Sequence, residues 1–68
     1  MREEVRNLVQ ERRTLAGITQ EELAEKVGVS RQTVIAIEKG KYTPSVLLAL
    51  KLARFFKVPV DTLFAIHS

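Results

Sequence analysis

Residues 19 to 38 read TQEELAEKVGVSRQTVIAIE and predict two short helices joined by a tight turn. Thr19 is a favourable N-cap, and Glu22 three residues later completes a capping box, so a helix is expected to begin directly after Thr19. Gly28 stands where a helix ends in a left-handed residue, a conformation that glycine adopts without steric cost. Ser30 is then expected to cap a second helix, because its hydroxyl can accept from a free backbone N–H of the first turn.

Apolar residues repeat at helical spacing in both segments. Leu23, Ala24 and Val27 share one face of the first helix, and Val34 and Ile37 share one face of the second. Ala24 is small, which allows the two helices to cross closely. The pattern therefore predicts a helix-turn-helix, a motif that places its second helix in the major groove of DNA.

The side of the second helix opposite its apolar face is the side available to a partner. Because an α-helix turns about 100° per residue, this side carries Gln32, Ile35, Ala36 and Lys39, with Arg31 at its edge. Glutamine can bind adenine, arginine can bind guanine, and apolar side chains can contact the methyl group of thymine. A solvated helix face is the alternative, but the preceding helix and the glycine turn favour DNA binding.

Length and composition limit the class of protein. Sixty-eight residues allow one small domain, residues 1–68, and a hydrophobic content of 46% is typical of a folded chain. The sequence has no cysteine, so packing or oligomerisation is expected to stabilise it. No apolar run approaches the roughly 20 residues that span a bilayer, and the charged start is not a signal peptide. We therefore expect no membrane partner and a cytoplasmic location.

The net charge of +3 is basic without being extreme, so the distribution of charge matters more than the sum. One basic group lies near helix ends that would face a duplex, where phosphate contacts are needed: Arg12, Arg13, Arg31, Lys39 and Lys41. Further along the chain, Lys51 and Arg54 are expected to form a solvated outer face of a helix.

The rest of the chain is expected to supply helical scaffolding. A first helix that ends near Gly17 is expected from the spacing of Val5, Leu8, Val9 and Leu15. Thr43 and Pro44 are expected to cap and begin a fourth helix. Its inner face is expected to carry Val46, Ala49, Leu50, Ala53 and Phe56, and a short last helix to cover residues 60–64. The predicted fold class is all-α, a bundle of five short helices with a central helix-turn-helix.

From about Val9 to Phe64 the sequence resembles the phage repressor and Cro class of helix-turn-helix regulators. The resemblance is carried by TQEELA at 19–24, VGVSRQTV at 27–34, IEKGK at 37–41, TPS at 43–45 and VDTLF at 60–64. It implies a lambda-repressor-like domain and a transcriptional regulator, expected to be a repressor. Such a regulator binds double-stranded DNA as a homodimer, at an operator with two half-sites.

The resemblance also implies roles for individual residues. Gln20 is implied to bond a phosphate, and Lys39, Lys41 and Tyr42 to lie beside the DNA backbone. With the residues of the second motif helix, the expected DNA-binding set is Gln20, Ser30, Arg31, Gln32, Thr33, Ile35, Ala36, Lys39, Lys41 and Tyr42. Two positions depart from the family pattern: Lys57 stands where many relatives have glycine, and Pro59 stands in place of a hydroxyl cap.

Glu38 ends the second helix of the motif, where the helix dipole disfavours a carboxylate and a cation is expected to compensate. Members of the phage repressor and Cro class pair the matching glutamate with an arginine of the first helix. The resemblance therefore implies a structural ion pair between Arg13 and Glu38.

A homodimer is expected because one recognition helix touches too few base pairs for selective binding. Some surface must then join the two copies. Apolar residues without an obvious internal partner are expected to form the dimer interface, namely Leu47, Phe55, Phe64 and Ile66, with the last two in or near the terminal helix.

Catalysis is not expected from this sequence. His67 lies at the end of the chain, and Asp61 is accompanied by no nucleophile with a base, metal-ligand cluster or phosphate-binding glycine loop. No catalytic residue, metal or cofactor is therefore predicted. Two other functions stay open: the antitoxin of a toxin–antitoxin pair, which would also bind a toxin protein, and a protein-interaction module similar to bridging coactivators.

Overall fold

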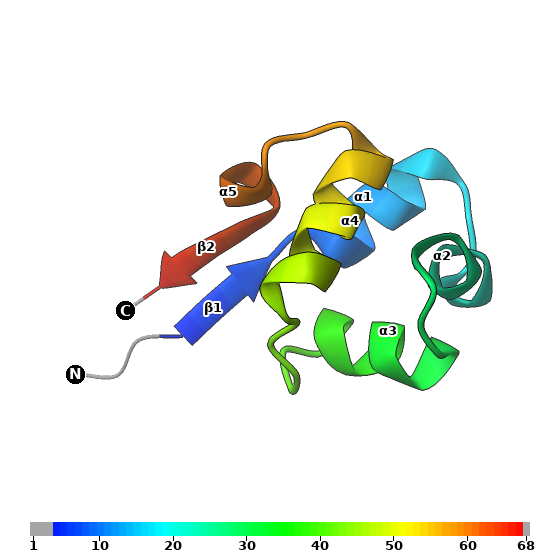
Figure 1. The fold of residues 1–68 in the computed structure, drawn as a ribbon, viewed down its shortest axis with the longest axis horizontal. Coiled ribbons are helices and arrows are strands. Elements are labelled where there is room, and N and C mark those ends of the chain that lie inside the picture. The colour runs from blue at the N-terminus through cyan, green and yellow to red at the C-terminus, as the bar shows by residue number, and fades with distance from the viewer. Residues whose placement is uncertain (1–3, 68) are drawn as a thin grey trace.

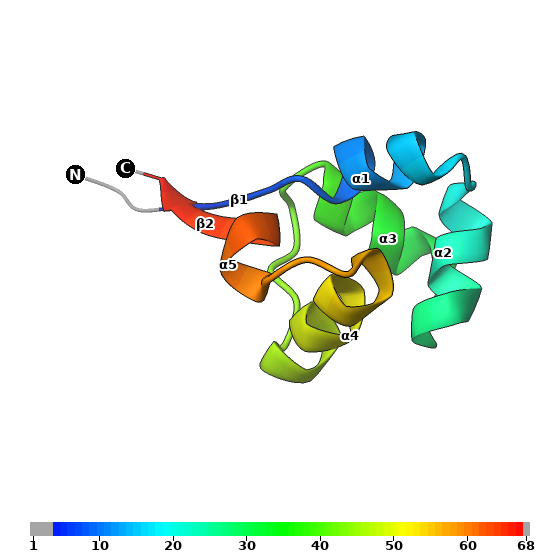
Figure 2. The same cartoon turned by 90° about the horizontal axis from the view of Figure 1, so that it is seen from above.

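The computed structural model describes residues 4–67, which form five helices and two strands. In chain order these are β1 (Glu4–Asn7), α1 (Val9–Ala16), α2 (Gln20–Val27), α3 (Arg31–Glu38), α4 (Val46–Phe56), α5 (Val60–Leu63) and β2 (Phe64–His67). The two strands lie at one end of the molecule and α2 at the other, with α3 along the lower edge of Figure 1. Seen from above, α1 and α4 lie on opposite sides (Figure 2).

Buried apolar side chains from all five described helices meet in one core. The most deeply buried large side chains are Val9 of α1, Leu23 of α2, Val34 and Ile37 of α3, Leu52 of α4 and Leu63 of α5. Burying a side chain of this size stabilises the fold by about 1.5–3 kcal/mol relative to leaving it exposed. Each short helix therefore depends on its neighbours, and α3 is held through the two residues of its inner face.

The boundaries of α2 and α3 agree with the predicted helix-turn-helix. The backbone N–H of Glu22 donates to the hydroxyl of Thr19 at 3.0 Å, and the backbone N–H of Thr19 donates to the carboxylate of Glu22 at 2.8 Å. Gly28 has φ of 76° and ends α2 in the left-handed conformation. The hydroxyl of Ser30 accepts from the backbone N–H of Thr33 at 3.2 Å. The capping box, the glycine turn and the second cap are all confirmed.

The prediction of an all-α fold is wrong at the two ends of the described chain. β1 pairs antiparallel with β2, and Val5 lies opposite Ile66. The first helix therefore begins at Val9, and the last helix ends at Leu63 before the chain enters β2. The spacing of Val5, Leu8 and Val9 is the same as on one face of a helix, so it predicted a helix here. The conformation of residues 4–7 is instead decided by their pairing with β2, near the other end of the chain.

The fourth helix begins later than the sequence predicted. Ser45, and not Thr43, is its N-cap, because the hydroxyl of Ser45 accepts from the backbone N–H of Leu48 at 3.2 Å. Pro44 therefore lies outside the helix. At 11 residues α4 is the longest helix of the described range, and no helix within residues 4–67 is long and apolar enough to cross a membrane.

The predicted inner face of α4 is also wrong in part. Leu48, Leu52 and Ala53 are buried, whereas Val46 and Leu50 are exposed at 76% and 50%. The sequence of α4, VLLALKLARFF, is apolar on nearly every side, so helical spacing does not select the buried face. Leu15, also expected in the core, is exposed on α1.

The two departures from the family pattern have different outcomes. Lys57 takes the left-handed conformation with φ of 60°, and the backbone N–H of Val58 donates to Ala53 at 3.0 Å. The end of α4 is therefore closed without glycine. The left-handed conformation costs free energy for Lys57, because its side chain crowds the backbone, whereas glycine would adopt it without this cost. Pro59 is the N-cap of α5 and supplies no side-chain cap.

Candidate nucleic-acid interface

The outward side of α3 presents the side chains that the sequence assigned to DNA. Arg31, Gln32 and Lys39 are exposed. Thr33, Ile35 and Ala36 are half-buried on the same helix, while Lys41 and Tyr42 are exposed in the loop that follows it. The arrangement brings polar, apolar and cationic groups together on one helix and its following loop.

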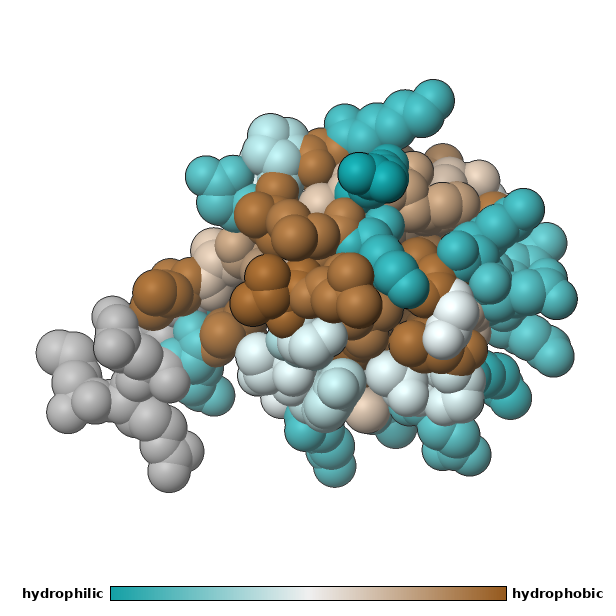
Figure 3. Space-filling model, viewed as in Figure 1, coloured by the Kyte–Doolittle hydropathy of each residue, from teal (hydrophilic) through white to brown (hydrophobic). Residues whose placement is uncertain are grey.

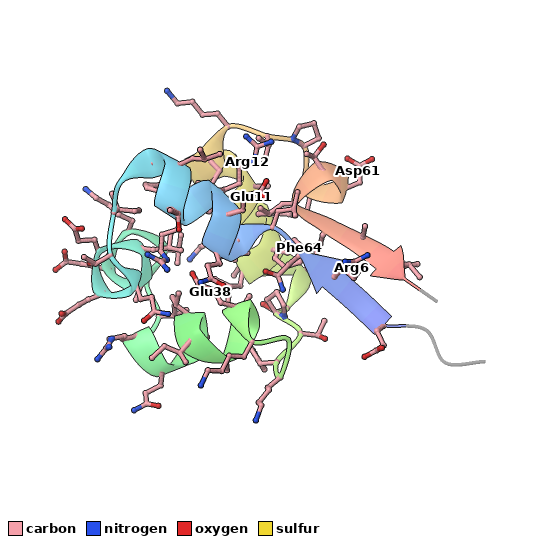
Figure 4. The ribbon with its side chains drawn as sticks, turned by 180° about the vertical axis from the view of Figure 1, so that it is seen from behind. Arg6, Glu11, Arg12, Glu38, Asp61 and Phe64 are labelled. Carbon is pink, nitrogen blue, oxygen red and sulfur yellow. The ribbon has the colours of Figure 1, made fainter. Side chains whose placement is uncertain are left out.

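The last residue of α3 is anchored to α1 by an ion pair. The Nε atom of Arg13 donates to Oε2 of Glu38 at 2.7 Å, and Nη2 donates to Oε1 at 3.3 Å. The side chain of Glu38 is only 3% exposed and that of Arg13 is 15% exposed. Figure 4 shows Glu38 in the interior, between α3 and α1. The pair that the resemblance implied therefore forms, in a setting with little water.

Two more hydrogen bonds complete this anchor. Nη1 of Arg13 donates to the backbone carbonyl of Ile18 at 2.9 Å, and Nε2 of Gln20 donates to Oε1 of Glu38 at 3.0 Å. The hydrogen bond to Glu38 and its negative charge raise the pKa of Arg13 above the ordinary value, against the opposing effect of burial. A raised arginine pKa contributes stability that is fully present below the ordinary value and is lost only as the pH rises through the raised one.

Three expected contact residues form hydrogen bonds within the protein. The hydroxyls of Ser30 and Thr33 lie 3.1 Å apart and share a hydrogen bond. Gln20 is half-buried, and its side-chain nitrogen already bonds Glu38. All three side chains therefore have a hydrogen-bond partner within the protein before any other molecule binds.

Sequence reasoning missed one residue of this region. Asn7 ends β1, and its side chain bonds the backbone of both α1 and α3. An asparagine directly before an apolar helical run is a signal for a cap. This signal was missed because the first helix was expected to include Val5, which would place Asn7 inside the helix and not before it.

The four residues expected at a dimer interface differ in exposure. Leu47 and Ile66 are exposed at 65% and 72%. Phe55 and Phe64 are half-buried and pack against the core, so they do have internal partners, contrary to expectation. Phe64 begins β2 and turns towards the helices in Figure 4, so the terminal segment that carries it is a strand and not a helix.

An exposed apolar surface lies on the outward side of α4. It comprises Val46, Leu47 and Leu50, and Figure 3 shows hydrophobic side chains gathered on this face of the molecule. Val60 of α5 and Ile66 of β2 are further exposed apolar residues. Of the residues considered for catalysis, Asp61 is exposed on α5, and the side chain of His67 lies outside the described part of the chain.

Comparisons with known proteins agree with this geometry. The helix-turn-helix family model matches residues 9–63 of the chain. An uncharacterized HTH-type transcriptional regulator of Methanocaldococcus jannaschii is 55% identical over 60 residues, which cover 88% of this chain and 91% of that protein. The cryptic phage CTXphi transcriptional repressor RstR of Vibrio cholerae is 41% identical over 46 residues, which cover 68% of this chain and 41% of the repressor.

A solved structure extends the likeness to three dimensions. The restriction-modification controller protein C.AhdI of Aeromonas hydrophila matches with a TM-score of 0.72 at 34% identity, covering 78% of this chain and 80% of that one. The matched range of the family model contains α2 and α3 with their caps and the loop that carries Lys41 and Tyr42. This chain therefore belongs to the helix-turn-helix family of DNA-binding transcriptional regulators.

Proposed function

We propose that this regulator is a repressor that binds double-stranded DNA as a symmetric homodimer, with α3 of each copy in the major groove. The observation that carries the proposal is the division of α3 into two sides. Val34 and Ile37 hold the helix on the core and Glu38 ties its end to α1 and α2, while Arg31 and Gln32 remain exposed. A rigid helix with free polar side chains is what base reading requires.

Gln32 is the residue that we assign to base recognition. Its exposed amide can make two hydrogen bonds to adenine, and Arg31 in the same turn can reach guanine or a phosphate. Ile35 and Ala36 are half-buried and offer apolar contact to thymine methyl groups. Discrimination between sequences therefore depends mainly on the first turn of α3.

Phosphate contacts are assigned to the groups that surround α3. Lys39, Lys41 and Tyr42 are exposed at its C-terminal end, where cations and a hydroxyl can bond the DNA backbone. The side-chain nitrogen of Gln20 carries two hydrogens and gives one to Glu38, so the other remains available to a phosphate. Gln20 would then connect the buried ion pair to the DNA.

The second copy of the chain is assigned to the exposed surface of α4. Val46 and Leu50 lie one helical turn apart, and Leu47 lies beside them. A two-fold axis next to these residues would bury each copy's apolar side chains against the same side chains of the other. We assign repression because a protein can repress a gene simply by occupying its operator. In addition, the relative RstR is named a transcriptional repressor.

Selection of bound sites from a random duplex library tests the DNA-binding part. Enriched sequences are expected to contain two inverted half-sites about one helical turn apart. Gln32→Ala should weaken binding to the enriched site by about 1–3 kcal/mol and relax one base position. Gln10→Ala is the matched control, because Gln10 is an exposed glutamine on α1. Absence of any enriched sequence at low salt, or equal losses for both variants, would contradict the proposal.

Light scattering tests the dimer. The wild-type chain is expected at twice its 7.7 kDa mass, and Val46→Glu combined with Leu50→Glu is expected to return it to the monomer. Leu15→Glu is the control, because Leu15 is an exposed leucine on α1. A dimer that survives in the double variant would place the interface elsewhere, with Ile66 as the next candidate.

A further inference from the structure

The side chain of Asn7 connects three elements that lie far apart in the sequence. Its Nδ2 donates to the backbone carbonyl of Ile37 at 3.0 Å, and its Oδ1 accepts from the backbone N–H of Val9 at 3.1 Å. Asn7 is the last residue of β1, Val9 is the first of α1, and Ile37 lies in the last turn of α3. Both ends of the amide are therefore occupied by backbone groups at helix termini.

The carbonyl of Ile37 is one of the groups that α3 itself cannot satisfy. The last four carbonyls of a helix lack an intrahelical partner. In the described structure Gly40 donates its backbone N–H to Ile37 at 2.9 Å, and Lys41 donates to Ala36 at 2.9 Å. The side chain of Asn7 supplies the second donor to Ile37, so both lone pairs of this carbonyl are used.

The position of Asn7 is in turn fixed by β2. Asn7 lies opposite Phe64 in the antiparallel pair, and the next backbone N–H, that of Leu8, donates to the carbonyl of Leu63 at 2.9 Å. The half-buried Phe64 packs on the core beside this pair. The end of β1 therefore has little freedom to move away from α3.

The hydrogen bonds to α3 are unevenly distributed between its two ends. Its beginning is capped locally by Ser30, whereas its last turn receives side-chain bonds from Asn7 of β1, Arg13 of α1 and Gln20 of α2. From this arrangement we infer that Asn7 is a positioning residue, which fixes the C-terminal end of the recognition helix α3 to the terminal sheet. Its effect on DNA binding rests on the function proposed above.

The functional consequence concerns the residues that follow Ile37. Lys39, Lys41 and Tyr42 follow shortly after Ile37, the residue whose carbonyl accepts from Asn7. A last turn that moves would shift these groups against the DNA backbone and tilt Gln32 in the groove. Asn7 touches no DNA in this scheme and acts through the backbone of α3.

Two substitutions separate the two bonds of Asn7. Asn7→Asp keeps an oxygen for the N–H of Val9 but removes the donor to Ile37, and it adds a charge to a surface hollow that Glu38 also borders. Asn7→Ala removes both bonds without adding charge. Val58→Ala is the control for lost stability, because Val58 packs on the core from the loop between α4 and α5.

Amide hydrogen exchange measures how firmly the end of α3 is held, and it needs no DNA. Both Asn7 variants should speed exchange at Gly40 and Lys41 about 3- to 10-fold relative to the last turn of α2, as expected when one hydrogen bond is lost. The amide of Val9 should lose protection in Asn7→Ala and keep it in Asn7→Asp. Val58→Ala should change α2 and α3 together. Unchanged relative exchange at Gly40 and Lys41 would overturn the inference.

Binding to the duplex enriched by selection gives the second readout. Both Asn7 variants should bind it about 3- to 10-fold more weakly, a loss not seen for Val58→Ala at a temperature where every variant is folded. Wild-type affinity in Asn7→Ala would overturn the effect on binding. If the wild-type chain enriches no duplex, the proposed function fails, and the exchange experiment alone decides whether Asn7 holds α3.

Discussion

Replacing Glu38 by glutamine changes one buried charge and almost nothing in size. The carboxylate now accepts from Nε of Arg13 at 2.7 Å, from Nε2 of Gln20 at 3.0 Å and from Nη2 of Arg13 at 3.3 Å. In Glu38→Gln one oxygen remains for Arg13, and the new NH2 group faces the NH2 group of Gln20. The side chain of Arg13, which is 15% exposed, is left without its counter-charge.

The size of the effect follows from these bonds. A hydrogen bond to a charged group contributes about 1.5–3 kcal/mol, against about 0.5–1.5 kcal/mol for a neutral one. Two of the three bonds are short enough to carry this difference, and the third is long. The partial exposure of Arg13 lets water replace some of the lost interaction. We therefore expect Glu38→Gln to lower the free energy of unfolding by about 2 kcal/mol.

Thermal and urea denaturation followed by circular dichroism measure this loss. A loss of 2 kcal/mol in a chain of this size lowers Tm by roughly 8–16 °C. Glu11→Gln, at an exposed position of α1, is the matched control and should stay within about 0.5 kcal/mol of wild type. Adding Arg13→Met to Glu38→Gln should recover part of the loss, because no unpaired charge remains. A Glu38→Gln variant as stable as the control would refute the reasoning.

Three further substitutions test other features of the molecule. Lys57→Gly should raise the free energy of unfolding by about 0.5–1 kcal/mol, because residue 57 has φ of 60° and glycine adopts it without strain; a lower Tm would contradict this. Leu52→Ala, at a residue 1% exposed, should cost about 2–5 kcal/mol in urea denaturation, whereas Leu15→Ala should cost less than about 0.5 kcal/mol. Lys41→Ala should weaken binding to specific and random duplexes equally and reduce the slope of log K against log salt by about one; a loss confined to the specific site would assign Lys41 to base reading.

The helix-turn-helix could be predicted because its determinants are local. Thr19 and Glu22 bond each other across one turn, and Gly28 has a conformation that a single residue type favours. Leu23, Ala24 and Val27 then fall on the buried face as their spacing predicted. Such signals are complete within a few residues of sequence, so no knowledge of the rest of the fold is needed.

The terminal sheet and the face of α4 could not be predicted in the same way. Val5 and Ile66 are paired across almost the whole chain, and a strand of four residues carries no periodic pattern of its own. Leu48 and Leu50 are identical in type, and packing against the other elements decides that the first is buried and the second exposed. The role of Asn7 depends on the first of these features, because it requires β1 to end beside α3.

The pairing of β1 with β2 also affects the order in which the chain folds. It closes a loop that contains every helix of the described structure, and the entropy of closing a loop grows with its length. Contacts between α2 and α3 are local by comparison, so the helix-turn-helix should form in the transition state and the strands should pair after it. Stopped-flow measurements on Val5→Ala should then show an unchanged folding rate and faster unfolding, whereas Ala24→Gly should slow folding. The recognition helix α3 would thus form its contacts with the core early and its hydrogen bond to Asn7 last. The first step of unfolding would then free the C-terminal end of α3, and with it the proposed DNA contacts, while the core is still closed.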